Sequence, residues 1–302
     1  MIEVTSRKNE GVSSGRFGTA ADMTPQQVHV AASNLMQRGM SFLAWRALDL
    51  LFAGGVMTVE QLGMTPRTMR RYAEKHVVKR YGASRKFVAE QLGEYGLDVK
   101  DGQLYTLGPV GVELVQIRHG VKPPTGYLSY SLERVLHDVI SNEIVLRIAQ
   151  EAEANGWRFI WASKYESTVF RDGVPILEPD AFIRLERDGV VYPFLIEYHN
   201  EDRSTRAVQK VRQYERAWES DLWQTPWEVD EFPPLLAIFR MPVVGEGYQE
   251  GIKESAPVSV DYYGRALSSL LATGGLSEFV HINKNKQGKV FPWYQGEDYE
   301  KK

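Results

Sequence analysis

The strongest constraint on how this chain folds is a turn signal between two apolar runs within residues 176–214. Asp188-Gly189 is typical of a two-residue hairpin turn, and the flanking residues are rich in Ile, Leu, Val, Tyr and Phe. If these two residues form the tip, the numbers of paired residues add up to 377, and Asp180 lies opposite Glu197. Directly opposed Cβ atoms are ~4.5–5.5 Å apart, so two carboxylates there repel each other unless a cation neutralises them.

The two faces of this predicted hairpin differ in character. Glu178 and His199 fall on the same face as Asp180 and Glu197, because side chains two residues apart share a face of a strand. The opposite face is apolar and carries Ala181, Ile183, Leu185, Tyr192, Phe194 and Ile196. Three carboxylates and an imidazole at one end of a buried hairpin are costly as structure, but they are suited to holding a divalent cation.

Composition indicates a globular protein and limits the side chains that could bind a metal. The 302 residues are 43% hydrophobic and 25% charged, which is typical of a globular protein with one large or two ordinary domains. The chain has no cysteine, so a metal would need oxygen or imidazole ligands. It has no apolar run of about 18 residues, and its N-terminus lacks the apolar core of a signal peptide. We therefore expect a cytoplasmic protein with no membrane contact.

Charge is distributed unevenly, which predicts two domains. Residues 1–120 hold 15 of the 36 Lys and Arg and 11 of the 39 Asp and Glu, so their net charge is +4 and that of the rest is −7. Residues 122–126, Lys-Pro-Pro-Thr-Gly, are predicted to form a stiff linker between them. The predicted organisation is a disordered arm (1–26), a DNA-binding domain (27–121), a second domain (127–285) and a polar tail (286–302).

The first domain has the pattern of a helix-turn-helix. Apolar residues recur at helical spacing over 27–53, and a short helix is predicted over 58–62. Thr65-Pro66 starts the next helix, which is expected to run to about residue 78. Two short strands within 96–107 resemble a wing, and a further helix follows from residue 109. The pattern predicts a winged helix-turn-helix.

The second helix of this motif is strongly basic and is the candidate DNA contact. Donors to DNA phosphates and base edges would come from Arg67, Arg70, Arg71, Lys75, Lys79 and Arg80. A basic helix can also face solvent without any partner, and the sequence leaves that alternative open. The sequence also leaves a homodimer open, and it contains no heptad pattern that would argue for one.

Helices and strands follow one another along the second domain in the order αβββαβ. The pattern predicts a helix over 129–154, a strand over 157–163, the two hairpin strands, a helix from residue 204 or 205 and a strand over 235–239. A helix over 262–271 and an edge strand over 279–282 complete it. Glu143 lies on the apolar stripe of the first helix, which is unusual unless the carboxylate lies at the rim or meets a metal or a cation.

This order resembles the PD-(D/E)xK nuclease superfamily, with an acid on the first helix, Pro179-Asp180 on the second strand and Glu197-x-His199 on the third. More closely, the chain resembles the replication-relaxation family of plasmid and mobile-element proteins, in which a winged helix precedes a nuclease-like domain. The supporting motifs, within residues 40–240, are LYTLGPVGVELV (104–115), His137, EPDAFIRL (178–185), FLIEYHNE (194–201) and KVRQY (210–214). The implied fold class is α+β and α/β in two domains, an N-terminal winged helix-turn-helix followed by a restriction-endonuclease-like αβββαβ domain.

The resemblance also implies roles for individual residues. Asp180 and Glu197 match the two metal-binding acids, and Glu143 matches the helix acid of some members. The chain departs from the superfamily at His199, where a lysine is expected. Lys210 on the next helix could supply that cation, and His199 could ligate the metal or position the attacking water. The implied reaction is phosphodiester hydrolysis assisted by Mg²⁺ or Mn²⁺.

Structural alternatives stand beside this interpretation. Asp180 and Glu197 could be a structural pair bridged by Arg184 or Lys164, and Lys210 could lie on a solvated helix face. Three hypotheses follow: a metal-dependent DNA endonuclease, a non-catalytic DNA-binding replication initiator or regulator that retains a degenerate nuclease fold, and a protein–protein adaptor that uses the acidic C-terminal domain.

Overall fold

The computed structural model of the chain describes residues 2–5, 23–121, 123, 131–162, 164–272 and 276–294. It has mixed α and β architecture and divides into two compact units, residues 3–143 and residues 144–302 together with 1–2. Most of the predicted arm and linker and the end of the predicted tail lie outside the described residues. Strand β1 (Ile2–Thr5) comes first, and helix α6 (Leu132–Ala154) contributes residues to both units.

The N-terminal unit combines helices with a small sheet. Its elements are α1 (Pro25–Gln37), α2 (Phe42–Gly54), β2 (Met57–Thr58), α3 (Pro66–Glu74), β3 (Val78–Arg80), α4 (Arg85–Glu94), β4 (Leu104–Leu107), α5 (Pro109–His119) and the start of α6. The strands form an antiparallel sheet in the order β2-β4-β3. Leu48, Leu51, Met69 and Leu114 are buried in the core of the unit.

Three boundaries in this unit differ from the prediction. The apolar pattern over 27–53 forms two helices, α1 and α2. The helix expected over 58–62 is wrong: Thr58 ends strand β2 and turns follow, although Thr58 and Gln61 exchange the reciprocal hydrogen bonds of a helix cap. The basic helix α3 stops at Glu74, because the chain turns at His76, with a φ of 56°, and then pairs as β3.

The predicted wing also has a different form. Residues 96–103 form no strand, and β4 pairs with β3 instead. Helix α4 lies between β3 and β4 in the chain, whereas the sequence predicts two adjacent wing strands within residues 96–107. Gly102 has a φ of +59°, and a Cβ at this position would clash with the Arg85 carbonyl oxygen at the start of α4. The close approach between this turn and α4 therefore requires glycine.

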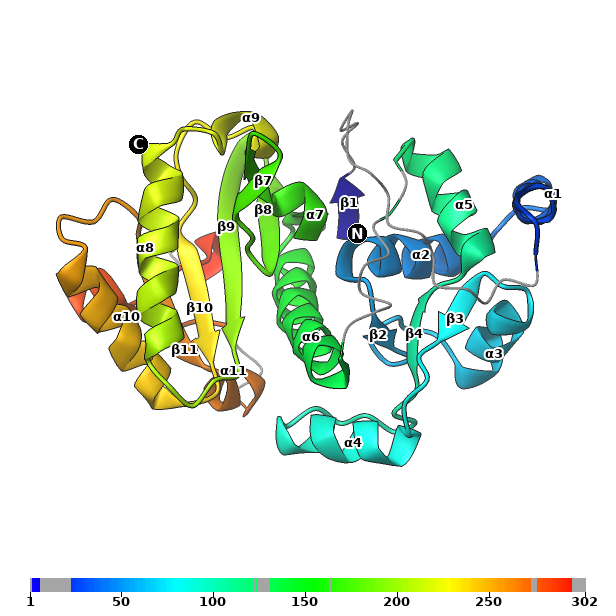
Figure 1. Ribbon diagram of the computed structural model, residues 1–302, viewed down its shortest axis with the longest axis horizontal. Helices are drawn as coiled ribbons and strands as arrows, with labels where there is room; N and C mark the ends of the chain where they lie inside the picture. Colours follow the sequence, from blue (N-terminus) through cyan, green and yellow to red (C-terminus); the bar gives the residue numbers. More distant parts are fainter. Residues whose placement is uncertain are drawn as a thin grey trace. The chain divides into compact units, whose positions relative to one another are not determined.

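The C-terminal unit is built on one mixed sheet (Figure 1). After the end of α6, its elements are β5 (Arg158–Ala162), α7 (Lys164–Ser167), β6 (Val169–Arg171), β7 (Val174–Leu177), β8 (Ala181–Arg187), β9 (Val190–His199), α8 (Thr205–Glu219), α9 (Gln224–Trp227), β10 (Leu235–Phe239), α10 (Pro242–Glu254), β11 (Tyr262–Ala266), α11 (Leu267–Ala272), β12 (Phe279–His281), η2 (Ile282–Lys284), β13 (Lys286–Gly288) and η3 (Pro292–Tyr294).

The strands of this unit lie in the order β5-β8-β9-β10-β11-β12-β13, and β6-β7 forms a separate hairpin. Strand β8 is antiparallel to β5 and β9, whereas β9, β10 and β11 run parallel. The predicted αβββαβ order is present as α6-β5-β8-β9-α8-β10. The single helix predicted over 262–271 is wrong, because Tyr262–Ala266 pairs with β10 as a strand before α11 begins.

The register predicted for the hairpin is confirmed. Ala181 pairs with Ile196 and Leu185 pairs with Tyr192, so the residue numbers add up to 377. Asp188 and Gly189 have φ values of 53° and 83°, as expected for a type I′ turn, which needs positive φ at both positions. Helices α8 and α10 pack side by side (Figure 1). Their buried residues share one core with side chains of β8, β9 and β10, including Phe182, Leu195, Val211, Leu235 and Tyr248.

The aromatic residues near the C-terminus pack within this unit. Phe291 is buried and its ring contacts those of Phe194 and Phe279, with centroids 5.4 and 6.0 Å away. None of the described helices is long and apolar enough to cross a bilayer.

Candidate functional site

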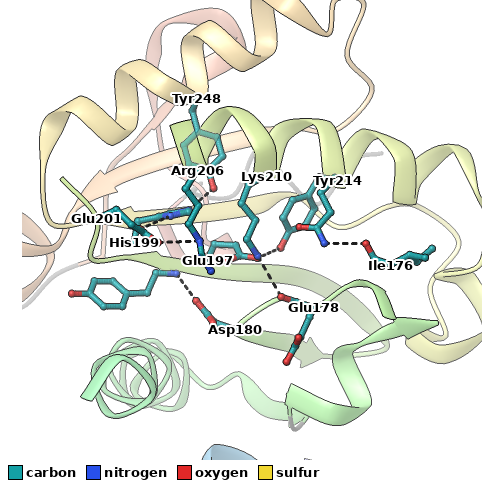
Figure 2. Close-up of polar contacts among 12 residues, drawn as sticks. Ile176, Glu178, Asp180, Glu197, His199, Glu201, Arg206, Lys210, Tyr214 and Tyr248 are labelled. Carbon is teal, nitrogen blue, oxygen red and sulfur yellow. Dashed lines mark hydrogen bonds and ion pairs between the residues drawn. The ribbon is translucent and has the colours of Figure 1, made fainter. Parts of the chain in front are cut away.

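The hairpin register brings Asp180 and Glu197 together at the end of β8. The Asp180 amide donates to the Ile196 carbonyl at 3.0 Å, so Asp180 lies against β9 just before β8 begins, although this bond is shifted by one residue from the register of the Ala181–Ile196 pair. Asp180 Oδ2 accepts a hydrogen bond from the Tyr198 amide at 2.9 Å. The backbone of β9 therefore holds the Asp180 carboxylate next to the strand that carries Glu197 (Figure 2).

Glu197 is only 2% exposed and receives two donors from α8. Its Oε1 accepts from Lys210 Nζ at 2.6 Å and from the Tyr214 hydroxyl at 2.7 Å. These donors are four residues apart, so they share one face of the helix, and Figure 2 shows both reaching toward Glu197. Lys210 Nζ also lies 3.4 Å from the Glu178 carbonyl oxygen. The buried carboxylate is thus neutralised by a cation from the following helix.

Two tyrosines around the site keep their protons. Burial is the largest reason why the pKa of Tyr214 is well above its ordinary value, and the negative charge of Glu197 raises it further. Burial also raises the pKa of Tyr248 on α10, with the charges of Glu197 and Asp180 adding to the effect. Both phenols are therefore neutral at physiological pH, and Tyr214 can act as a hydrogen-bond donor to Glu197.

His199 lies in a chain of polar side chains beside the carboxylate pair. The ring is 1% exposed, its Nδ1 is 3.2 Å from Glu201 Oε2, and its Nε2 is 2.8 Å from the Tyr248 hydroxyl. Burial raises the pKa of Glu201, but the hydrogen bond and electrostatic attraction of His199, together with Arg206, lower it to about 2. Both ring nitrogens are engaged with other side chains, so a role for His199 as a metal ligand would require one of these contacts to open.

The predicted metal ligands fall in different units. Glu143 belongs to the N-terminal unit, where Gln61 Nε2 donates to it at 3.3 Å. Asp180 and Glu197 belong to the C-terminal unit. Arg184 pairs with Glu186 and Glu228, so the structural alternative in which Arg184 bridges the two acids is wrong. The roles of Asp180, Glu197, His199, Lys210 and Glu143 in a metal-dependent reaction stay predictions.

The donor chemistry of the Asp180–Glu197 pair fits a hard divalent cation. Among the residues that the structure describes, no group of three or more His, Asp or Glu is arranged to hold a metal. Mg²⁺ commonly binds through one or two carboxylates, while water and substrate phosphates complete its shell. A pair of carboxylates on adjacent strands matches that requirement, but Lys210 competes for Glu197.

The predicted DNA-binding residues divide between a helix and a strand. Thr65 caps α3 by accepting from the Thr68 amide at 3.2 Å, as predicted. This helix and its C-cap carry four exposed basic side chains, those of Arg67, Arg70, Arg71 and Lys75. Lys79 and Arg80 lie in strand β3. The helix predicted to run to about residue 78 ends at Glu74, so Lys75 at its C-cap is the last basic residue of this segment.

Sequence reasoning missed two groups near the site. Tyr214 follows Lys210 by one helical turn, so the spacing alone could have flagged it as a second donor to Glu197. Tyr248 lies on α10, a helix that the sequence analysis does not predict. No local signal links Tyr248 to His199, because 48 residues separate them and their contact depends on the packing of α10 against α8.

Comparisons with known proteins point to one family. Neither the curated proteins nor the solved structures include a significant match to this chain. The family model described as replication-relaxation matches residues 48–229, which is more than half of the chain. This range includes α3, the β8–β9 hairpin and the whole of α8, which carries Lys210. The chain belongs to the replication-relaxation family, as its motifs predict.

Proposed function

We propose that this protein binds DNA through its N-terminal unit and hydrolyses phosphodiester bonds at the Asp180–Glu197 pair, in the replication or maintenance of plasmid or mobile-element DNA. The observation that carries the proposal is the buried Glu197 beside Asp180, with Lys210 Nζ at 2.6 Å. A carboxylate pair with an adjacent cation has the charge pattern that phosphodiester hydrolysis uses. Family membership supports the setting in replication.

The N-terminal unit supports DNA binding by its topology and charge. The order α2-β2-α3-β3-β4, with the sheet order β2-β4-β3, is compatible with a winged helix whose wing strands are separated by α4. Helix α3 would be the recognition helix. Its Arg67, Arg70 and Arg71 are exposed, and no ion pair between described residues includes them. Such guanidinium groups can bind DNA phosphates or base edges.

In the C-terminal unit each side chain would have a defined task. Asp180 and Glu197 would hold Mg²⁺ or Mn²⁺, which when bound lowers the pKa of water and polarises a phosphoryl oxygen. The Tyr198 amide fixes the orientation of Asp180, and Tyr214 does the same for Glu197. Lys210 would offset the negative charge that develops on the phosphate.

A non-catalytic DNA-binding initiator or regulator is the second candidate. It is favoured by the short contact between Lys210 and Glu197. In this case the two residues form a closed structural ion pair. The N-terminal unit alone would then provide the function.

One experiment separates these candidates. Relaxation and nicking of supercoiled plasmid DNA are measured with Mn²⁺ for the full-length chain and for Asp180→Ala, while fluorescence anisotropy reports DNA binding. The matched control is Asp202→Ala, because Asp202 is 85% exposed and pairs only with Arg203 at 4.0 Å among its described contacts. Arg70→Ala with Arg71→Ala tests the N-terminal unit.

The nuclease proposal predicts Mn²⁺-dependent cleavage that Asp180→Ala abolishes and Asp202→Ala keeps, with DNA binding intact in both variants. DNA binding without any cleavage by the wild type would establish the non-catalytic candidate. If the double variant Arg70→Ala with Arg71→Ala binds DNA as well as the wild type, the proposed role of α3 is wrong. A wild-type protein that ignores DNA altogether would refute both candidates.

A further inference from the structure

A basic groove lies between hairpin β6–β7 and helix α8. Its volume is about 550 Å³, and its lining residues are Arg171, Ile176, Gln209, Arg212, Gln213, Arg216 and Ala217. These residues supply three guanidinium and two carboxamide groups and no carboxylate. The unit around the groove is acidic, since residues 144–302 hold 19 Lys and Arg against 25 Asp and Glu, a net charge of −6. The groove is therefore a local site of positive charge.

Helix spacing produces this lining. Gln209, Arg212, Gln213 and Arg216 follow one another at intervals of three, one and three residues, which places them on one stripe of α8. Lys210 and Tyr214 lie on the neighbouring stripe and meet Glu197. Helix α8 thus presents one face to the carboxylate pair and the adjacent face to the groove. Arg171 comes from the opposite wall, where it precedes the turn of the β6–β7 hairpin.

The arginines of the groove are available to an external anion. Arg171 and Arg216 are exposed, and neither takes part in an ion pair between described residues. Arg212 Nη2 lies 2.7 Å from Glu254 Oε2, but the two side chains are 53% and 44% exposed, and such surface pairs contribute little. A guanidinium group binds phosphate through two parallel hydrogen bonds, which makes arginine well suited to a phosphate backbone.

Contacts along α8 connect the groove with the carboxylate pair. Gln213 Nε2 donates to the Ile176 carbonyl at 3.0 Å, and Lys210 Nζ lies 3.4 Å from the Glu178 carbonyl. The chain from Ile176 to Glu178 therefore follows α8 from the groove to the site. Lys210 and Arg216 are six residues apart, which is about 9 Å along a helix axis. A DNA strand bound in the groove would thus lead directly to Asp180 and Glu197.

We infer that Arg171, Arg212 and Arg216 bind backbone phosphates of the DNA strand that enters the Asp180–Glu197 site. This inference rests on the proposed function, because it takes DNA as the bound polyanion. It adds a DNA contact in the C-terminal unit that is separate from helix α3. The rest of that unit is acidic and would repel a DNA strand, so the strand would follow the groove.

The test is the salt dependence of DNA binding by the full chain. Affinity for a fluorescein-labelled duplex and for one of its strands is measured by anisotropy between 50 and 300 mM KCl, for the wild type and for Arg171→Gln with Arg216→Gln. Both arginines are exposed, so these substitutions leave the core intact. The charge-matched control is Lys284→Gln with Lys286→Gln, which changes two exposed residues outside the groove.

Loss of two phosphate contacts lowers the slope of log affinity against log salt by about 1.8 for a duplex or about 1.4 for a single strand. We expect this loss in the arginine variant and not in the lysine control, and Arg171→Lys with Arg216→Lys restores most of the slope. An arginine variant with the wild-type slope would overturn the inference while DNA binding itself stands. No binding by the wild type would remove the proposed function and the inference together.

Discussion

The contact between Lys210 and Glu197 supports a quantitative prediction. Lys210→Met removes the ammonium group and leaves a carboxylate that is 3% exposed with only the Tyr214 hydroxyl as a described donor to Oε1. Breaking one side of a buried ion pair costs about 3–5 kcal/mol, because the remaining charge is neither solvated nor paired. Since Tyr214 still donates, we expect a loss near the lower end, about 3 kcal/mol of unfolding free energy.

The control compares a pair of similar length that is exposed. Arg212 and Glu254 are 2.7 Å apart, but both side chains are largely in solvent. Arg212→Met is therefore expected to cost about 0–1 kcal/mol. Both variants are unfolded in urea at pH 7 and followed by tryptophan fluorescence. Six of the seven tryptophans lie in residues 144–302, so this signal reports mainly on the C-terminal unit.

A double variant decides whether the charge is the cause. In Lys210→Met with Glu197→Gln the buried carboxylate is neutral, so most of the lost stability should return, and the cycle gives the coupling energy of the pair. If Lys210→Met loses no more stability than Arg212→Met, or if adding Glu197→Gln gives no recovery, then burial does not set the strength of this ion pair.

Two other features give predictions that concern stability alone. The pKa of Glu201 is lowered to about 2, so its carboxylate stabilises the fold above the pKa of an unfolded Glu, about 4.3, and this contribution disappears as pH falls toward 2. Between pH 5 and 2.5, the unfolding free energy of Glu201→Gln, measured in urea, should therefore fall by about 1–2 kcal/mol less than that of the wild type. This value is smaller than the full pKa shift would give, because Glu201 is 31% exposed. Equal pH dependence in both proteins would contradict this. Gly102→Ala should lower the unfolding free energy of the N-terminal unit by more than about 2 kcal/mol, because alanine disfavours a φ of +59° and its Cβ would meet the Arg85 carbonyl. Unfolding is followed by circular dichroism, and Gly82→Ala, with open space around it, is the control. Similar losses in both variants would show that the close approach at Gly102 is not rigid.

The part of the site that the sequence predicts is the part that local chemistry encodes. A turn dipeptide with positive φ at both positions fixes the hairpin register, which pairs Ala181 with Ile196 and so brings the next residues, Asp180 and Glu197, to the same end of the hairpin. The helical position of Lys210, thirteen residues after Glu197, makes it the nearest candidate cation along the chain. Each of these inferences needs only a short stretch of sequence.

The parts that the sequence does not predict depend on contacts between distant segments. Tyr262–Ala266 becomes a strand because it pairs in parallel with β10, and the sequence analysis joins it to the helix α11 that follows directly. Helix α10 contains three glycines, which lower helix propensity. Two of them, Gly247 and Gly251, lie against Ser204 and against Val208 and Val211, where a Cβ would be crowded. The glycines that make α10 hard to predict from the sequence therefore also allow it to pack closely.

The origin of the site's cation on α8, and not on strand β9, has a consequence for how related sequences diverge. A change of Glu197 alone would leave a buried ammonium, and a change of Lys210 alone would leave a buried carboxylate, so we expect the two positions to change together or not at all. Position 199 is relieved of that constraint. Its histidine is coupled instead to Glu201 and to Tyr248 on α10, so these three positions form a second group whose members should covary independently of the first.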